Sequence, residues 1–364
     1  MPKPIPTPYS PLLPPGEAER ESVHQVYEAI APHFSLTRYK PWPLVSQFLA
    51  SLPPNTLGLD SGAGNGKYVP LAREQGREVV ALDMSWGLLS VARGAIETKA
   101  ECLRGELGYD GWRARVFDWA ISIAAIHHLS TPERRAQGVK ALLNALALHR
   151  DTEDTPCSRF MIYVWAFEQG EGSKRKMGKR AAREAREGGR VGHSAEAQSD
   201  EGQGGTIASG TDDTEGMTNR VKGLSTQSPS NPPTIDAKTT QQSATTTHPA
   251  DSPAGPPVVA PPADGTPVVQ DVLVPWVLQP KPGTKETQAE EPKVFHRYYH
   301  LFLRGELREL VESAARDDGY IVVASPDQGA ALGPEDKWMK VVSEGWEADN
   351  WWLEGLVGVG PTRG

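Results

Sequence analysis

The chain has 364 residues with a formal net charge of −8, 36 glycines, 32 prolines and two cysteines. Two cysteines without Cys-x-x-Cys spacing exclude a disulfide framework and a zinc site of their own, and no run approaches the ~20 apolar residues of a membrane span. Without a targeting pattern the protein is expected in the cytoplasm or nucleus, and its acidic charge disfavours a general nucleic-acid-binding surface while allowing local basic clusters.

The first elements are helices. Residues 1–19 are rich in proline and are expected to form a disordered tail. A helix is predicted to start at Ser22, which has capping-box spacing, and to end at Pro32. Its apolar face repeats at three and four residues: Val23, Val26, Tyr27 and Ile30. A second helix, over 44–49, is expected to stop before a Pro-Pro pair.

An α/β core follows. Strands are expected near 57–60, 78–83, 117–123 and 159–165, and helices near 66–75, 85–97 and 132–149. This alternation, with almost continuously apolar strands, predicts a mostly parallel sheet covered on both faces. Ligands of such sheets bind at the carboxyl ends of the strands.

Composition changes completely over 170–265, which is rich in Gly, Ser, Thr, Pro and Gln. This segment is predicted to be a disordered insertion, because it cannot bury enough apolar surface to offset its chain entropy. Its basic stretch 171–193 is interpreted as a solvated linker, with a polyanion-binding arm as the alternative. Order is expected to return with four elements: 268–278, a helix over 306–316 and strands over 320–324 and 346–357. A single domain of 20–168 plus 268–357 is predicted.

A glycine-rich loop follows the first strand. Asp60 is followed by Gly62, Gly64 and Gly66, and Asp83 ends the next strand. Alternate glycines allow a close approach of a ligand to the main chain, and an acid at the second strand tip can accept hydrogen bonds from a ribose diol. The spacing departs from the dinucleotide pattern Gly-x-Gly-x-x-Gly, and an acid at position 60 would repel a pyrophosphate. The pattern favours S-adenosylmethionine, whose amino-acid end is cationic, over a ligand-free turn.

Two histidines, His127 and His128, are expected at the end of the third strand, where an acceptor would meet the donor. Neighbours on a strand face opposite ways, so one of the two is expected to face the site. A neutral imidazole there could hydrogen-bond the acceptor, and a structural histidine is the alternative. No metal site is predicted, because no acid nearby in sequence supplies a third ligand.

Seven separated blocks, within about 20–168 and 268–357, occur in the order typical of one family. They are 26–35, 37–43, 65–68, 117–131, 274–277, 297–301 and 349–352. In these blocks the chain resembles the eukaryotic tRNA wobble-uridine carboxymethyl methyltransferases. The resemblance implies a seven-strand, Rossmann-like methyltransferase fold with S-adenosylmethionine as donor. It also implies methyl esterification of a carboxymethyl group on the wobble uridine of tRNA, and a small zinc-binding activator subunit bound along the sheet edge.

The chain departs from that family in two places. Ala63 stands where the family loop usually has cysteine, and because alanine is small and apolar the loop should still form. The segment 101–106 replaces the Ala-Asp pair that holds the adenine amino group in the family, and Glu106 is the nearest acid.

The reaction implied by the resemblance sets the remaining candidates. A carboxylate acceptor is already ionised at neutral pH, since its free pKa is about 4, so no general base is required. A forked cation can hold one carboxylate oxygen and leave the other free, and Arg38 is the first candidate, with a locally paired surface arginine as the alternative. Candidates for tRNA contact are Tyr39, Lys40, Arg297, Tyr298 and His300.

Two rival functions remain open. A small-molecule carboxyl or phenol methyltransferase would need neither the 297–300 cluster nor an activator, and would methylate metabolites without tRNA. A catalytically silent RNA-binding scaffold with this fold would not bind S-adenosylmethionine. A nicotinamide dehydrogenase is disfavoured by the glycine spacing and by Asp60.

Overall fold

The computed structural model describes residues 4–10, 12–94, 100–150, 156–170, 268–278, 293–324 and 331–361. All of them lie in one compact unit. The predicted disordered insertion, with its basic stretch, lies outside these residues apart from Gly170. No helix of the described part of the chain is both long and apolar enough to cross a membrane.

The main sheet has the strand order β4-β3-β2-β5-β6-β11-β10-β9. Its strands are β2 (Leu57–Ser61), β3 (Glu78–Asp83), β4 (Glu101–Arg104), β5 (Trp119–Ile123), β6 (Ser158–Trp165), β9 (Ile321–Val322), β10 (Lys337–Glu347) and β11 (Asn350–Val359). The five neighbouring strands β4-β3-β2-β5-β6 are all parallel to one another, whereas β11 is antiparallel to both β6 and β10. The predicted methyltransferase fold class is confirmed, with β9 as a short additional strand at the edge.

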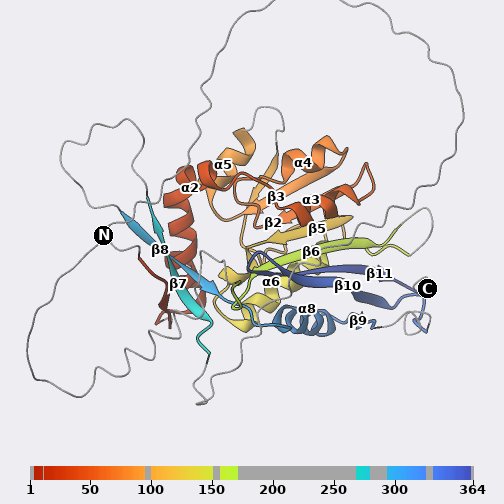
Figure 1. Cartoon of the computed structure of the whole chain (residues 1–364). Helices are drawn as coiled ribbons and strands as arrows, with labels where there is room; N and C mark the ends of the chain where they lie inside the picture. Colours follow the sequence, from red (N-terminus) through yellow and green to blue (C-terminus); the bar gives the residue numbers. More distant parts are fainter. Residues whose placement is uncertain are drawn as a thin grey trace, which may run out of the picture. The chain divides into compact units, whose positions relative to one another are not determined.

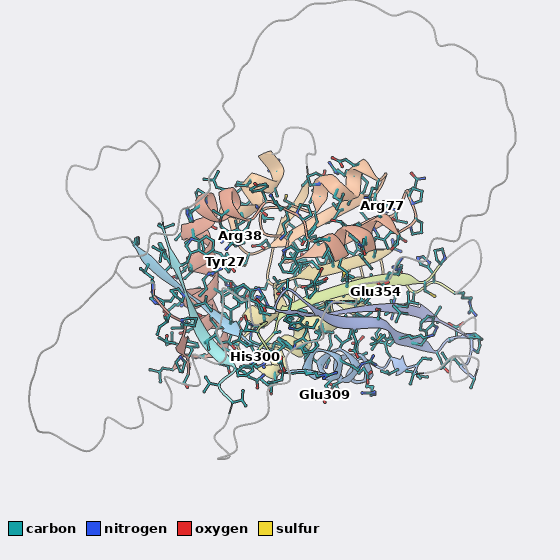
Figure 2. The ribbon with its side chains drawn as sticks, viewed as in Figure 1. Tyr27, Arg38, Arg77, His300, Glu309 and Glu354 are labelled. Atoms are coloured by element: carbon teal, nitrogen blue, oxygen red, sulfur yellow. The ribbon has the colours of Figure 1, made fainter. Side chains whose placement is uncertain are left out.

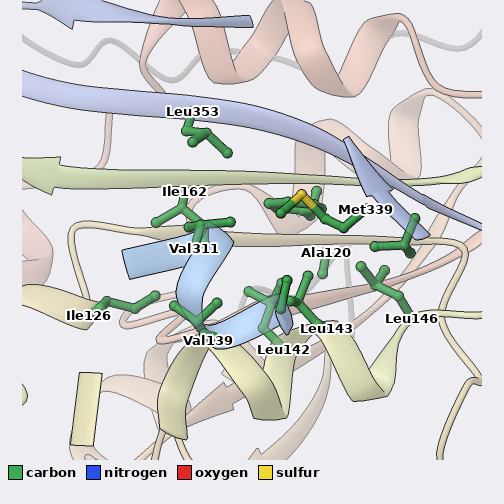
Figure 3. Packing of buried hydrophobic residues seen from close by; sticks show 14 of the residues in the cluster. Ala120, Ile126, Val139, Leu142, Leu143, Leu146, Ile162, Val311, Met339 and Leu353 are labelled. Atoms are coloured by element: carbon green, nitrogen blue, oxygen red, sulfur yellow. The ribbon is translucent and has the colours of Figure 1, made fainter. Parts of the chain in front are cut away.

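Helices cover both faces of this sheet (Figure 1). On one face lie α3 (Pro43–Ala50), α4 (Val69–Glu74) and α5 (Trp86–Gly94), which pack on Trp119 and Tyr163. On the other lie α6 (Pro132–Ala145) and α8 (Glu306–Asp317). Figure 3 shows the second layer, where α6 and α8 side chains pack against the strands. Because both faces are covered, every residue of β5 is buried, which explains why its sequence is apolar apart from Ser122.

Segments from before and after residues 171–267 share this sheet. β6 precedes that gap and β11 follows it, yet the two pair over eight residue pairs, from Asn350 with Trp165 to Val357 with Ser158. The predicted final strand over 346–357 is in fact the end of β10, a turn and most of β11. The turn residues Ala348 and Asp349 have φ values of 46° and 65°, as two-residue hairpin turns require.

A second, three-stranded sheet has the order β1-β7-β8, with β1 (Thr7–Pro8), β7 (Asp271–Val277) and β8 (Val294–His300). Three consecutive helical segments, α1 (Pro15–Glu19), the π-helical η1 (Arg20–His24) and α2 (Gln25–Thr37), follow β1, and the second and third of them contact β8. The structure therefore differs from the disordered tail predicted over 1–19. Strand pairing with β7 and burial of Ala18 and Glu19 order described parts of that segment.

The predicted boundaries of the first helix need correction. Ser22 is not an N-cap, because its hydroxyl donates to the carbonyl of Ala18 inside a continuing helix. Pro32 does not end α2, which continues to Thr37. Burial of Ile30 and Ala31, the two residues before Pro32, supports the helix through this point, and tertiary packing outweighs the local cost of proline.

Candidate functional site

A pocket of about 480 Å³ opens at the carboxyl ends of β2, β3 and β5. Its walls come from the loops after these strands, from α2 and the segment that follows it, and from β7 and β8. Tyr27 and Arg38, labelled in Figure 2, both line it. The small sheet therefore forms one wall of the pocket and the loops of the main sheet form another. Residues more than two hundred positions apart in the sequence both line it.

The glycine loop has the backbone that its sequence predicts. Gly62, Gly64 and Gly66 have φ values of 85°, 57° and 68°. The N–H groups of Gly62 and Ala63 donate to the carbonyl of Leu82, so the loop forms with alanine in place of cysteine. A β-carbon on Gly64 would meet nothing closer than 4.0 Å, which leaves this part of the main chain open to the pocket.

Two carboxylates stand at this loop. Asp83 accepts hydrogen bonds from the N–H of Gly64 and of Ser85, both at 2.8 Å. Burial raises its pKa, and the backbone N–H groups of Ser85 and Gly64 oppose that rise. Asp60 is 1% exposed, and its Oδ2 has no hydrogen-bond partner among the described residues. Burial raises the pKa of Asp60 to about 7, although Lys67 nearby lowers it.

Lys67 was not singled out as a site residue from the sequence. It lines the pocket, and its Nζ lies 4.9 Å from the ring centroids of Trp42 and of Tyr68. Burial lowers its pKa to about 8, with Asp60 raising it and Arg38 lowering it. The amino-acid end of a donor would therefore meet charges of both signs, as a zwitterion requires.

Glu106, the predicted adenine contact, lines the pocket but is half exposed. It pairs with Arg134 at 3.1 Å, and Arg134 also pairs with the buried Glu19 at 2.6 Å. The structure thus brings Glu106 to the pocket within an ion-pair network. Its contact with adenine stays a prediction.

Both histidines line the pocket, and their rings lie 4.5 Å apart. The expectation that they alternate on a strand is wrong, because β5 ends at Ile123 and they lie on a single 3₁₀ turn, Ile126–His128. His127 Nδ1 accepts from the N–H of Trp165 at 3.1 Å. His128 Nδ1 donates to the carbonyl of Tyr298 at 2.7 Å, so its Nε2 accepts from the Tyr27 hydroxyl at 2.9 Å.

Burial lowers the pKa of His128 to about 3, with Arg297 contributing in the same direction. The imidazole is therefore neutral at physiological pH and a weak base. Because both of its nitrogens are engaged with the protein, we interpret His128 as a group that positions Tyr27.

Three predicted residues, Arg38, Tyr39 and Lys40, lie at the pocket and are all exposed. Arg38 donates to the carbonyl of Thr37, and its Cζ lies 5.3 Å from the Trp276 ring. Lys40 lies 6.0 Å from the Tyr39 ring. This arrangement places two cations and an aromatic ring on a solvent-facing part of the pocket wall.

The predicted RNA-contacting cluster at 297–300 is divided by the alternation of β8. Arg297 and Tyr299 line the pocket, whereas Tyr298 and His300 point away from it. The Tyr298 hydroxyl donates to Asp271, and His300 lies 2.6 Å from Glu306. Both side chains are buried and lie outside the pocket lining, and their contact with tRNA stays a prediction.

The predictions named Arg297 as a site residue but neither Tyr27 nor Trp276, and they included Tyr299 only as a member of the 297–300 cluster. Tyr27, Trp276 and Tyr299 all line the pocket and surround its guanidinium. Tyr27 looked like one member of an apolar helix face, and Trp276 like part of a strand. The only sequence feature that could have identified them is that each lies in one of the family-like blocks, 26–35, 274–277 and 297–301.

The buried state of His128 predicts a measurable pH dependence of stability. Its folded pKa lies below the unfolded value, so its contribution is complete above about pH 6.5 and is lost as the pH falls. Between pH 7 and pH 5 this amounts to a loss of about 2 kcal/mol. Urea unfolding of the His128→Gln variant should show a pH-dependent loss smaller by that amount than in the wild type. Equal pH dependence in the two proteins would contradict the assigned protonation state.

Residues 59–146 match a protein-family profile described as a methyltransferase domain. A Saccharomyces cerevisiae protein named tRNA (carboxymethyluridine(34)-5-O)-methyltransferase is 41% identical over 155 residues, which are 43% of this chain and 52% of that protein. A mouse (Mus musculus) relative described in the same way is 31% identical over 337 residues, 86% of this chain and 43% of its own length. The Schizosaccharomyces pombe protein of that name is 27% identical over 349 residues, 93% of this chain and 96% of its own length.

The chain therefore spans about half the length of the first two of these curated relatives. The methyltransferase profile and the relatives indicate S-adenosylmethionine as the cofactor. The residues of the glycine loop fit it. Asp60 Oδ2 is a buried acceptor without a partner in the described residues, Gly64 leaves the main chain accessible, and Asp83 lies where a ribose can be bound.

Proposed function

We propose that this chain, a homologue of the tRNA (carboxymethyluridine(34)-5-O)-methyltransferases, methylates the carboxylate of a carboxymethyl group on the wobble uridine of tRNA. One observation carries the proposal. A single pocket combines buried acids at the glycine loop, which suit a cationic donor, with a buried guanidinium on β8, which suits an anionic acceptor.

When bound, S-adenosylmethionine supplies an electrophilic sulfonium methyl, whose transfer breaks the carbon–sulfur bond, leaves the electron pair on sulfur and forms the ester bond to a carboxylate oxygen. No proton leaves the acceptor, because the carboxylate is already ionised. The protein's residues therefore need to bind, orient and exclude water rather than act as bases. A neutral, fully engaged His128 with a pKa of about 3 agrees with this requirement.

Exposed residues beside the pocket support a nucleic-acid acceptor. Arg38, Tyr39 and Lys40 offer charge for a phosphate backbone and a ring on which an unpaired base can stack. We also propose that a small zinc-binding activator subunit binds along the sheet edge. Among the described strands, β4 pairs only with β3, so its outer edge is available for strand addition.

The two alternatives differ from this proposal in what they bind. A small-molecule carboxyl methyltransferase would act on free carboxylates and would leave the exposed cations beside the pocket without a role. A silent RNA-binding scaffold would not need the glycine loop and the two carboxylates, which are intact in the structure.

The proposal predicts strict dependence on the acceptor's carboxylate. Methyl transfer from labelled S-adenosylmethionine should occur on tRNA that bears 5-carboxymethyluridine at the wobble position and stay at background on tRNA with unmodified uridine. The assay is run with and without the activator, and base-labile release of the label identifies an ester. Equal labelling of both tRNAs would disprove the substrate assignment, and efficient labelling of small carboxylic acids without tRNA would favour the first alternative.

A further inference from the structure

Arg297 is a buried cation for which the described residues provide no counterion. The residue is 5% exposed, and no carboxylate of the described chain lies within ion-pair distance of its guanidinium. Its Nε is buried with no hydrogen-bond partner in the part of the chain that the structure describes. Burying a guanidinium in this state is strongly unfavourable relative to burying a paired one. A residue that contributed only to stability would not be expected in this state, which points to an anion supplied by a ligand.

Three aromatic rings enclose this guanidinium. Its Cζ lies 4.6 Å from the ring centroid of Trp276, 5.2 Å from Tyr299 and 5.6 Å from Tyr27. Aromatic faces stabilise a cation only partly, and they also displace water from around it. In such surroundings an anion that reaches the remaining N–H groups would be bound more strongly than at a solvated arginine.

A chain of hydrogen bonds fixes the orientation of the group. His128 Nδ1 must donate to the Tyr298 carbonyl, so Nε2 is the acceptor for the Tyr27 hydroxyl hydrogen. The Tyr27 oxygen then accepts from Arg297 NH1 at 3.2 Å. The guanidinium also hydrogen-bonds with Tyr299, while its Nε has no partner among the described residues and is left to meet a carboxylate. Tyr27 and His128 thus act as positioning residues for the guanidinium.

S-adenosylmethionine also carries a carboxylate, which could in principle be the anion that Arg297 binds. Other charged side chains, however, lie at the glycine loop, where the amino-acid end of the donor is expected. Lys67 interacts electrostatically with Asp60 at the glycine loop and also with Arg38, whose Cζ lies 5.3 Å from the Trp276 ring. Arg297 instead interacts with His128, Tyr27 and Tyr299. Resting on the proposed function, we propose that Arg297, rather than Arg38, is the fork that binds the carboxylate of the acceptor. Arg38 is exposed, so water and salt would weaken any such contact there.

This assignment can be tested by binding as well as by activity. The full-length protein, saturated with S-adenosylhomocysteine, is titrated with the nucleoside 5-carboxymethyluridine and with its neutral amide counterpart, 5-carbamoylmethyluridine. The wild type should prefer the carboxylate, and the Arg297→Met variant should lose at least ~30-fold of that preference. An Arg297→Lys variant keeps the charge but not the fork and should recover only part of it. Undiminished preference in Arg297→Met, or no preference in the wild type, would overturn the proposal.

Two further measurements separate this role from a structural one. Replacing an unpaired buried charge by an apolar side chain of similar length should leave the melting temperature of Arg297→Met unchanged or higher, and S-adenosylmethionine should bind as it does to the wild type. On carboxymethylated tRNA, kcat/KM should fall at least ~100-fold in Arg297→Met and less than ~10-fold in Arg38→Ala. An equal loss of donor affinity would assign Arg297 to the donor instead and overturn the proposal.

Failure of the proposed function would give a different result from failure of the assignment of Arg297. In that case the wild type would leave tRNA unmethylated while still distinguishing the carboxylate from the amide through Arg297. A surface arginine, Arg308, which pairs with Glu312 and Glu344, provides the matched control. Arg308→Met removes a guanidinium outside the pocket and should change neither the preference nor kcat/KM. If it reduced both as Arg297→Met does, the effect would be one of overall charge and the assignment to Arg297 would be wrong.

Discussion

Replacing Asp83 with alanine is expected to reduce the affinity for S-adenosylmethionine at least ~100-fold and to abolish methyl transfer. The carboxylate has two roles. It holds Gly64 and Ser85 through hydrogen bonds of 2.8 Å to their N–H groups, and it is proposed to accept hydrogen bonds from the donor's ribose. Isothermal calorimetry with the donor and with S-adenosylhomocysteine measures the effect, and because both ligands carry the ribose, both should lose affinity equally.

Asp118 provides a matched control for this variant. It also accepts a hydrogen bond from a backbone N–H of β2, that of Leu57 at 2.9 Å, but at the end of the strand opposite the pocket. Asp118→Ala should therefore lose stability while binding the donor within about twofold of the wild type, since distant sites act independently. Donor affinity that fell equally in both variants would show a general loss of structure rather than a specific contact.

Donor affinity should also depend on pH through Asp60. Burial raises the pKa of this acid to about 7, and a cationic ligand binds its ionised form. Between pH 5.5 and pH 7 the ionised fraction rises from about 3% to about one half, so the apparent affinity should increase ~15-fold. The donor's own α-amino group stays protonated across this window.

The Asp60→Asn variant isolates this effect because it keeps the size of the side chain and removes the titration. Its donor affinity should be weaker than that of the wild type at pH 7 and nearly constant from pH 5.5 upward. Calorimetric titrations at four pH values compare the two proteins. A flat wild-type curve would show that Asp60 does not meet the donor's positive charge.

The donor side of the site was predictable because its signals are local in the chain. Positive φ angles at Gly62, Gly64 and Gly66 follow from residue type and spacing, and Asp83 is placed by the end of a strand that apolar periodicity identifies. The sequence also predicted that the loop forms with Ala63 in place of the family's usual cysteine, since alanine is small and apolar and is buried in the structure. The parallel sheet then brings these loops to one edge.

Predictions failed where packing overrides a local rule. Pro32 lies within α2 because buried neighbours support the helix, although proline normally marks a helix end. The histidine pair lies on a 3₁₀ turn because Ala124 has a φ of 57° and ends the run of β5. The apolar sequence of this segment gives no sign of that break.

The sequence by itself determined the parallel α/β sheet and the glycine loop, because both depend on residue types at fixed short spacings, and its resemblance to a family implied the methyltransferase fold. Only the tertiary structure decided how the acceptor side is built. Arg297 and Tyr27 lie 270 positions apart, and both faces of β8 carry large buried side chains, so periodicity cannot show which face meets the pocket. Packing of the small sheet against α2 resolves this, because it buries Tyr298 and His300 on the far side and encloses the guanidinium of Arg297 in the pocket.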